Sequence, residues 1–421
     1  MATKAKNCWL QLGALSGVPL LMVLGNSLLI PMLPQMGRVM RLSKSTTGLT
    51  ITTFSLAAGI GIAFAGYAAD KWGRKKVIIP SLILYGVGGI IAGCAGLFLG
   101  RGAFPLVMVG RVVQGLGAAG TAPVAMAFVG DLFQGQDRVT ALGILEAANG
   151  LGKLLAPILG ALIGLVFLWW VTFFIFAGLV IPIAALVLFL TQEVERKPAP
   201  PLKEYLGALG QLFKKEWRVL VSALWIGTVA LAVLFALLFY LSQHLEEAHG
   251  IDGLPKGFWL AGPVGSMCVT SFITGIVLQK KPDLLKPLIG VGLGLILTGL
   301  LLMALLTADW ALITGIIMSG VGTGLQLPGL NNLITSAAAA EQRGAVTALY
   351  GAVRFFGVAI GPPVVGLLMA KSERLPFWIE VALVVTAIIA LFLAGPGKQK
   401  QQPTGRRPPG VPPWRPPEFE K

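Results

Sequence analysis

The chain has 421 residues, of which 55% are hydrophobic and only 12% are charged, and its formal net charge is +15. Its mean hydropathy is +0.81. A soluble protein with so little charge lacks the polar groups to cover its surface, so the composition excludes an ordinary soluble domain. Apolar runs of about 20 residues, enough to cross the hydrocarbon core of a bilayer, recur along the sequence and predict an all-α polytopic membrane protein.

The apolar runs predict twelve transmembrane helices. The first follows Lys4 and Lys6 and stays apolar past Met32 without a clear small-residue cleavage site, so we interpret it as a retained anchor helix rather than a signal peptide. The predicted spans cover residues 9–33, 46–69, 77–99, 105–129, 139–165, 171–191, 219–243, 257–278, 287–306, 311–335, 345–370 and 376–394.

The basic residues predict the orientation of these spans. With both termini in the cytoplasm, most of the 33 lysines and arginines fall in cytoplasmic segments, which is the positive-inside bias of a multi-pass protein of the cell membrane. The first external loop goes against this bias with Arg38, Arg41 and Lys44, although later external loops carry acidic residues. The positive net charge indicates contact with anionic membrane lipids and not with nucleic acid.

A charged, proline-containing segment separates the sixth and seventh predicted spans. We predict a six-helix bundle over residues 1–194, a cytoplasmic linker over 195–216, a second six-helix bundle over 217–395, and a basic, proline-rich cytoplasmic tail over 396–421. The two halves match at one constant offset, which predicts pseudo-symmetric bundles with a substrate site between them near the membrane midplane. The matching pairs include Gly110 and Gly315, Pro123 and Pro328, Gly152 and Gly357, and Pro157 and Pro362.

The loop "GYAADKWGRKK", residues 66–76, gathers charge between the second and third predicted spans. A positive-inside anchor explains its lysines, but it explains neither the acid Asp70 at the membrane edge nor Gly73. We expect Gly66 to let another helix approach closely, and Asp70 to face a helix N-terminus or a cation. The spacing G-x-x-x-D-[RK]-x-G-[RK]-[RK] is met by Gly66, Asp70, Lys71, Gly73, Arg74 and Lys75.

This loop resembles the signature loop of the major facilitator superfamily, and two further elements extend the resemblance over nearly the full chain. "RVVQGLGAAG", with Arg111 and Gln114, is similar to an element of the fourth span in that superfamily. "GLGKLLAPILG" and "GVAIGPPVVG" are similar to the antiporter element of proton-driven drug exporters, although Ala156 replaces one glycine of that element. The resemblance implies the major facilitator fold and a twelve-span drug:proton antiporter.

The resemblance also implies roles for particular residues. In the family the signature loop contributes to the gate that locks the cytoplasmic side, and the arginine of the fourth span is associated with proton coupling. These roles fall on Asp70 and Arg74 with the rest of the loop, and on Arg111. The departures in the fifth span put antiport, more than transport, in doubt. Close helix packing is expected at Gly152, Pro157, Gly160, Gly357, Gly361 and Pro362.

Four ionisable residues lie well inside predicted spans: Arg111, Glu146, Lys153 and Arg354. A charge at the bilayer centre costs about 2.5 to 3.5 kcal/mol, so such residues usually face a wet cavity or a partner. Spacings of three and four place Glu146, Asn149 and Lys153 on one helix face, with about 10 Å between the first and the last. Glu146 is the acid that we assign, with Arg111, to proton coupling.

We hypothesise a central cavity with one cation from each half, Lys153 and Arg354, that binds an anionic or zwitterionic headgroup. The alternative is that these cations only neutralise Glu146 or fix helix packing. Other polar residues predicted to line the cavity are Asn26, Gln114, Asn149 and Gln326. For the two glutamines, interhelical hydrogen bonding is at least as good an interpretation.

The sequence lacks motifs that would indicate a nucleotide-binding protein, a metalloprotein or an enzyme. Gly115, Gly117 and Gly120 satisfy G-x-G-x-x-G, but they lie in a membrane helix without a preceding strand, so no nucleotide or other cofactor is expected. Two lone histidines, His244 and His249, do not predict a metal site. We predict a monomeric transporter, not an enzyme, that exports a small amphiphilic compound with proton coupling. A lipid or glycolipid flippase of the same fold and a passive facilitator are the alternatives.

Overall fold

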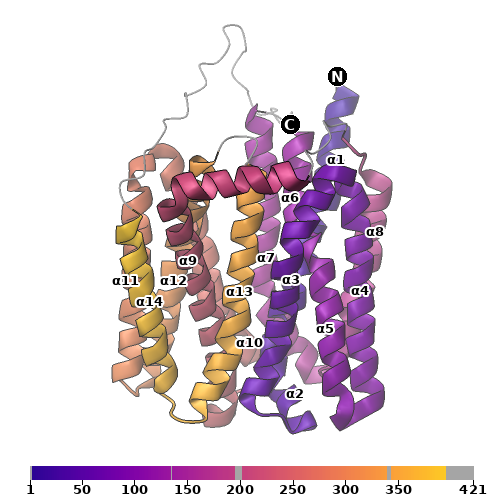
Figure 1. The fold of residues 1–421 in the computed structure, drawn as a ribbon. Coiled ribbons are helices and arrows are strands. Elements are labelled where there is room, and N and C mark those ends of the chain that lie inside the picture. Colours follow the sequence, from indigo (N-terminus) through magenta and orange to yellow (C-terminus); the bar gives the residue numbers. More distant parts are fainter. Residues whose placement is uncertain (1, 134, 195–201, 339–342, 395–421) are drawn as a thin grey trace, which may run out of the picture.

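The computed structural model describes residues 2–133, 135–194, 202–338 and 343–394, and the predicted tail over 396–421 lies outside them. Within these ranges the chain is almost entirely helical and contains no strand, which confirms the predicted fold class. Figure 1 shows two groups of roughly parallel helices side by side, one formed by the first half of the sequence and one by the second.

The first group contains η1 (Ile30–Met32), η2 (Gly100–Ala103) and eight α-helices: α1 (Ala2–Ser27), α2 (Leu33–Met40), α3 (Lys44–Trp72), α4 (Arg74–Leu99), α5 (Phe104–Ala119), α6 (Ala122–Leu132), α7 (Gly135–Val166) and α8 (Val171–Leu190). The second group contains η3 (Pro282–Leu284) and six α-helices: α9 (Leu202–His249), α10 (Gly253–Lys280), α11 (Leu285–Leu305), α12 (Asp309–Ala337), α13 (Arg343–Met369) and α14 (Leu375–Leu393).

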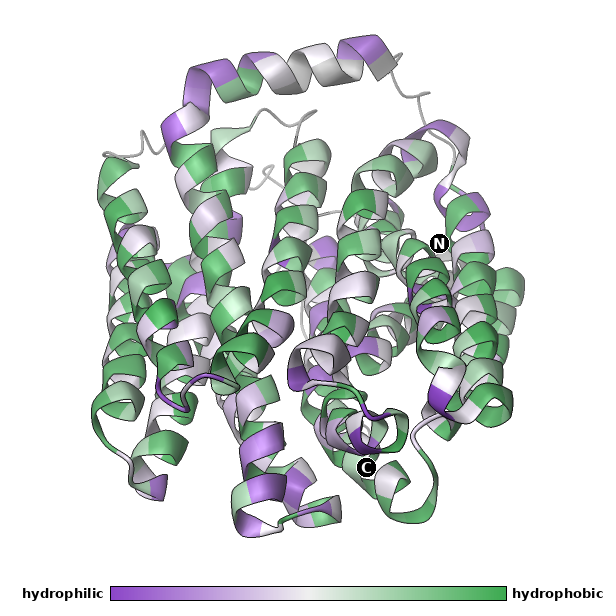
Figure 2. Cartoon of the chain, turned by 60° about the horizontal axis from the view of Figure 1, so that its bottom comes forward, coloured by the Kyte–Doolittle hydropathy of each residue, from purple (hydrophilic) through white to green (hydrophobic). Residues whose placement is uncertain are grey.

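Eleven stretches of the described chain are long and apolar enough to cross a membrane. One of them, Arg74–Leu132, has 59 residues and contains both α4 and the α5–α6 pair, so the count is consistent with twelve crossings. Hydrophobic residues cover the helices of both groups, while hydrophilic residues gather near helix ends and on a helix that lies across one end of the molecule (Figure 2).

Two predicted spans are interrupted where proline or glycine stands. The span predicted at 105–129 divides into α5 and α6, because Thr121 leaves the helical conformation at φ −100° and ψ −95° and Pro123 cannot donate a backbone hydrogen bond. The first span ends at Ser27, and the chain continues through η1 into the short helix α2, in a segment that holds Pro31 and Pro34. Composition alone does not reveal either break.

Helix α9 has 48 residues and bends at Glu216, where φ is −117° and ψ is 25°. The part before the bend, which we call the arm, lies across the end of the bundle, and the part after it runs down through the second group (Figure 1). The arm belongs to the segment predicted as a linker over 195–216, of which residues 195–201 lie outside the described ranges.

The two groups meet along two helix pairs, α3 with α13 and α7 with α10. Glycines bring these backbones together. A Cβ at Gly48 of α3 would lie 2.8 Å from Pro363 N of α13, and a Cβ at Gly257 of α10 would lie 2.9 Å from Ile158 Cα of α7. We call the end of the bundle that carries α2 the α2 end, and the opposite end, which carries the arm, the arm end.

Glycines pack equivalent helices together inside each half, and of the four glycines involved, Gly152 and Gly357 match at the constant offset. Gly160 of α7 lies against Leu28, just after α1, and a Cβ there would overlap the Leu28 carbonyl oxygen. Gly357 of α13 lies against α9, and a Cβ there would overlap the Thr228 carbonyl oxygen. Gly152 and Gly361 make similar approaches to Leu20 and Ala232. The repeat that the sequence shows is therefore repeated in packing.

The glycine packing gives a stability prediction. Gly160→Val or Gly357→Val should lower the free energy of unfolding by about 1 to 3 kcal/mol, because the added side chain must displace backbone of the facing helix. Thermal unfolding in detergent measures the effect. Gly178→Val is the matched control, since nothing lies within 4 Å of a Cβ at Gly178. Equal melting temperatures in all three variants would contradict the packing.

Candidate functional site

The guanidinium of Arg111 on α5 is fully buried and fixed by both neighbouring helices. Its Nε donates to Thr50 O at 3.0 Å, its Nη1 to Gly25 O at 3.1 Å and Gln114 Oε1 at 2.7 Å, and its Nη2 to Asn26 Oδ1 at 3.1 Å. Its Cζ lies 4.3 Å from the centre of the Phe54 ring. Within the described residues no carboxylate forms a salt bridge with it. This arginine thus joins α1, α3 and α5 and leaves a positive charge in the first half.

The Arg111 network accounts for two residues that were predicted to line a cavity. Asn26 is 5% exposed and Gln114 is 0% exposed, and both side-chain oxygens accept hydrogen bonds from Arg111. Asn26 Nδ2 also donates to Ser55 Oγ at 3.5 Å. Both residues are thus directed to the arginine.

Lys153 of α7 and Arg354 of α13 come from different halves and interact electrostatically, as like charges. Lys153 also interacts with the Glu146 carboxylate, which stabilises its positive charge. The guanidinium of Arg354 lies over the Tyr350 ring at 5.1 Å. Glu146 is exposed, while Lys153 and Arg354 are partly buried. The predicted charged residues of the two halves therefore come together.

Several polar atoms on the helices that carry these charges have no hydrogen-bond partner among the described residues. They are Asn149 Oδ1 on α7, Arg354 Nε on α13, and both side-chain polar atoms of Gln326 on α12. Burying such atoms unpaired is costly, so they have unused capacity to bind water or a ligand.

Glu380 of α14 is a further buried acid, which the sequence analysis missed although it lies inside the predicted span 376–394. It is 4% exposed, and neither carboxyl oxygen has a hydrogen-bond partner in the described chain. It lines a small apolar pocket with residues of α9 and α13, including Ala232, Ala236 and Gly361. It therefore stands apart from the Lys153 and Arg354 pair.

The signature loop forms a network inside the first half. Gly73 adopts φ +114°, and a Cβ there would lie 2.8 Å from Glu193 Cδ. The backbone N–H groups of Arg74 and Lys75 donate to Glu193 Oε1 and Oε2 at 2.8 and 2.9 Å. A carboxylate thus caps the N-terminus of α4, where the helix dipole favours negative charge. The sequence analysis did not identify Glu193 in this role.

Asp70 was expected to face a helix N-terminus or a cation, and it pairs with a cation of its own loop. Arg74 Nη2 lies 2.6 Å from Asp70 Oδ1, and Arg74 Nε donates to Asp131 Oδ2 of α6 at 3.3 Å. Lys75 Nζ donates to Leu188 O and Thr191 O, both at 2.7 Å. Lys71 is exposed. Gly66 lies near α13, since a Cβ there would be 3.7 Å from Ala348 Cβ.

At the α2 end, ion pairs join the two halves. Arg38 pairs with Glu246, Lys44 Nζ lies 2.6 Å from Glu247 Oε2, and Lys256 Nζ lies 2.6 Å from Glu246 Oε2. The Arg38 and Lys44 pairs cross between the halves, and we call these two the interhalf ion pairs, whereas Lys256 and Glu246 both belong to the second half. Lys256 is 0% exposed and also donates to Pro31 O at 3.1 Å. Ser242 Oγ adds a hydrogen bond to Ile30 O at 3.1 Å.

The ion pairs of the signature loop at the arm end stay within the first half, whereas the Arg38–Glu246 and Lys44–Glu247 pairs at the α2 end cross between the halves. The structure is therefore held shut at the α2 end. Arg38 and Lys44, which oppose the positive-inside bias, have acidic partners there.

Two bundles of membrane-spanning helices, with a lysine of one and an arginine of the other that interact electrostatically, are the architecture of a membrane transporter. The family model described as Major Facilitator Superfamily matches residues 15–292 and 283–418. The chain belongs to this superfamily, as its sequence motifs indicated.

The relatives of this chain include an exporter and a multidrug resistance protein. A bacillibactin exporter of Bacillus subtilis (strain 168) is 37% identical over 393 residues, which cover 92% of this chain and 97% of that protein. Multidrug resistance protein 2 of the same organism is 33% identical over 140 residues, which cover 33% of this chain and 34% of that protein.

Solved structures share the fold. A bacterial homolog to the human lysosomal transporter Spinster, in an inward-facing and unoccupied conformation, superposes with a TM-score of 0.72 at 19% identity and covers 92% of this chain and 97% of its own. The human organic anion transporter MFSD10 (TETRAN) gives a TM-score of 0.69 at 16% identity, with coverage of 91% and 99%.

The closure at the α2 end yields a conformational prediction. Lys256→Met should shift the population toward separation of the halves at this end, because it removes the buried partner of Glu246 and the hydrogen bond to Pro31 O. Spin labels at the exposed residues Val39 and Leu306, in a chain whose three cysteines are replaced, report the distance by pulsed electron paramagnetic resonance.

The control for this prediction is Lys371→Met, which removes an exposed lysine of the same end. This variant should keep the distance distribution of the parent chain. An unchanged distribution in Lys256→Met as well would show that the buried lysine does not hold the halves together.

Proposed function

We propose that this transporter exports a small amphiphilic compound with an anionic group, in exchange for protons, by alternating access. The observation that carries the proposal is the approach of Lys153 and Arg354 from opposite halves, with Arg354 Nε and Asn149 Oδ1 left without partners. Two like charges held near each other are stabilised when an anion lies between them. A carboxylate, phosphate or other oxyanion supplies that charge and accepts the hydrogen bonds of the guanidinium.

The names of two similar proteins support an anionic or amphiphilic substrate. The relative that aligns over nearly the whole chain is a bacillibactin exporter, and one structural neighbour is an organic anion transporter. We therefore choose bacillibactin as the first compound to test. Other anionic and zwitterionic amphiphiles form the rest of the panel.

The placement of the two cations suggests how binding is linked to movement. Lys153 belongs to the first half and Arg354 to the second, so one anion between them draws the halves together at that level. The interhalf ion pairs then compete with this contraction, because they hold the opposite end shut. With the arm end in the cytoplasm, as the basic residues predict, we assign the closure at the α2 end to the state that admits substrate from inside.

Glu146 is the proposed site of proton coupling, together with the positive field of Arg111. Its carboxylate interacts with Lys153, so it lies within reach of the same ligand. A cationic group of a zwitterionic substrate and a proton compete for this carboxylate. When the two occupants exclude each other, outward movement of substrate is coupled to inward movement of a proton.

The cation pair gives a prediction for transport. Lys153→Ala and Arg354→Ala should each reduce export of bacillibactin from cells that express the chain by at least about tenfold, because a charge-assisted hydrogen bond contributes about 1.5 to 3 kcal/mol. Arg374→Ala, which removes an exposed arginine before α14, is the matched control and should export normally. Normal export in both cavity variants, at equal amounts of protein in the membrane, would overturn the proposal.

Proton coupling is tested by neutralising the two membrane acids in turn. In inverted vesicles, uptake of a zwitterionic amphiphile by the unmodified chain should release protons and should stop when a protonophore is added. Glu146→Gln should bind substrate without this proton release. Its substrate affinity should no longer fall as the pH is lowered, because no carboxylate remains to take up a proton.

Glu380→Gln is the matched variant, since Glu380 is buried against α9 and α13 and does not approach Lys153 in the structure. It should keep proton release. Loss of coupling in Glu380→Gln and not in Glu146→Gln would contradict the assignment and point to the buried acid of α14. Substrate flux that does not depend on the pH gradient, in the unmodified chain or in any variant, would indicate a passive facilitator.

A further inference from the structure

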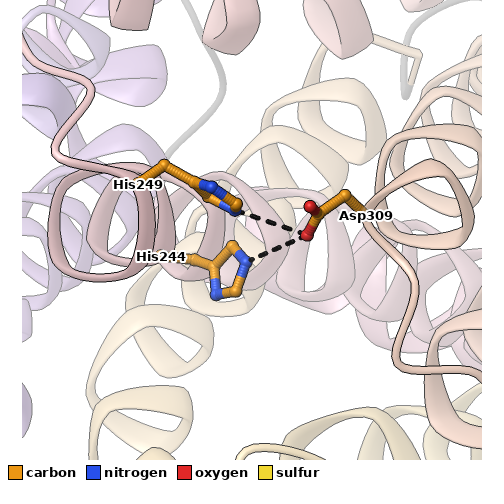
Figure 3. A group of neighbouring side chains, drawn as sticks. All are labelled: His244, His249 and Asp309. Atoms are coloured by element: carbon orange, nitrogen blue, oxygen red, sulfur yellow. Dashed lines mark ion pairs between the residues drawn. The ribbon is translucent and has the colours of Figure 1, made fainter.

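The sequence contains only two histidines, and the structure brings both to one carboxylate at the α2 end. His244 and His249 lie on the last turns of α9, and Asp309 is the first residue of α12. Figure 3 shows both rings directed toward the Asp309 carboxylate. Asp309 Oδ1 lies 3.3 Å from His249 Nε2 and 3.9 Å from His244 Nε2, and one ligand atom from each residue lies within 4.8 Å of the others.

Local structure explains why these three side chains meet. α9 ends at His249, where Gly250 adopts φ +64° and its N–H donates to Glu246 O at 3.2 Å, as in an αL C-cap. The ring of His244 stacks on Tyr240, with centroids 5.6 Å apart and planes at 16°. Asp309 lies beside the two histidines because α12 packs against α9. The cluster is therefore held by secondary structure on both sides.

We propose that His244, His249 and Asp309 bind a divalent transition-metal ion of the Zn²⁺ class, with a coordination position left for water. Two imidazole nitrogens and one carboxylate oxygen are ligands that such ions accept, and three protein ligands leave the fourth position of a tetrahedron open. With metal–ligand distances of about 2.0 to 2.2 Å, tetrahedral ligands lie roughly 3.4 Å apart. The pair His249 and Asp309 already has this separation, and His244 needs only a small displacement.

Two observations favour a metal over a simple contact among the three groups. His244 Nε2 is buried, and within the described residues its polar contact is the ion pair with Asp309 Oδ1 at 3.9 Å, which is longer than a hydrogen bond. The rings of His244 and His249 also lie 5.3 Å apart by centroids, so both imidazoles lie beside the same carboxylate. A metal ion binds both rings in their neutral form.

A cavity beside the three residues gives an ion access to this site, and binding of an ion affects the last turn of α9. His244 lines a cavity of about 170 Å³ together with Lys44, Tyr240, Glu247 and Glu373. Lys44 and Glu247 are one of the interhalf ion pairs. Because Glu246 and Glu247 lie on the same last turn of α9 as the histidines, a metal that fixes this turn also fixes the acidic partners of the first half. The site is separate from the proposed substrate site on α7 and α13.

The test uses the full chain, purified with an affinity tag that contains no histidine. Zn²⁺ binding is measured by competition with a chromophoric chelator, and Co²⁺ alone serves as a spectroscopic probe. We expect one Zn²⁺ per chain and tetrahedral Co²⁺ absorption without thiolate charge-transfer bands. His244→Ala, His249→Ala and Asp309→Asn should each weaken Zn²⁺ binding by about 100-fold, while Ca²⁺ and Mg²⁺, which prefer oxygen ligands, should not compete.

Glu373→Gln is the matched control, since it removes an acid of the same cavity that is not among the three ligands. It should bind Zn²⁺ like the parent chain. The melting temperature without metal shows that each variant folds, and only the parent chain and Glu373→Gln should be stabilised by Zn²⁺. The proposal is overturned if the parent chain fails to bind Zn²⁺, or if folded His244→Ala and His249→Ala bind it equally well.

Discussion

The structure depends on how charged side chains are stabilised inside a membrane protein, where they have almost no contact with water. A buried ion must be paired, bound by dipoles or placed where a ligand reaches it, and the protein uses all three solutions. Arg111 is surrounded by carbonyl and amide oxygens of α1, α3 and α5, so its charge is a fixed part of the first half. Lys256 is paired with Glu246. Lys153 and Arg354 are partly buried and interact as like charges from opposite halves, although Lys153 also interacts with Glu146, and this distinguishes them from Arg111 and Lys256.

The same principle separates the two ends of the molecule. At the arm end, Glu193 accepts hydrogen bonds from the backbone N–H groups at the start of α4, and Asp131 pairs with Arg74. Both acids belong to the same half as the loop, so the loop stays intact when the halves move apart. At the α2 end, the acids on α9 belong to one half and Arg38 and Lys44 to the other, so closure is made of contacts that separation would break. Contacts within a half are therefore kept when the halves move, whereas the contacts between the halves at the α2 end are made only in the conformation that is closed there.

The sequence predicted the helices and their pairing in two halves, because a span needs about 20 apolar residues and a duplicated bundle repeats its close glycine contacts. It also suggested a shared site for Lys153 and Arg354, which stays a prediction, and the two residues interact electrostatically in the structure. It did not predict Glu193 as the cap of α4, the burial of Lys256, or the approach of Asp309 to the histidines. Each of these depends on side chains far apart in sequence, at positions where neither hydropathy nor a local motif carries a signal. Glu380 was open to detection, since an acid inside an apolar run is visible in the sequence.

Helix α9 connects the elements on which movement depends. It begins as the arm, bends at Glu216, where φ and ψ leave the helical region, crosses the second half, and ends in the turn that carries Glu246, Glu247 and His249. The bend gives the arm and the span different directions. That turn contacts the first half through acids and α12 through imidazoles, so its position is set from two sides. A ligand that fixes the imidazoles thereby limits the freedom of the acids, although it touches only one half.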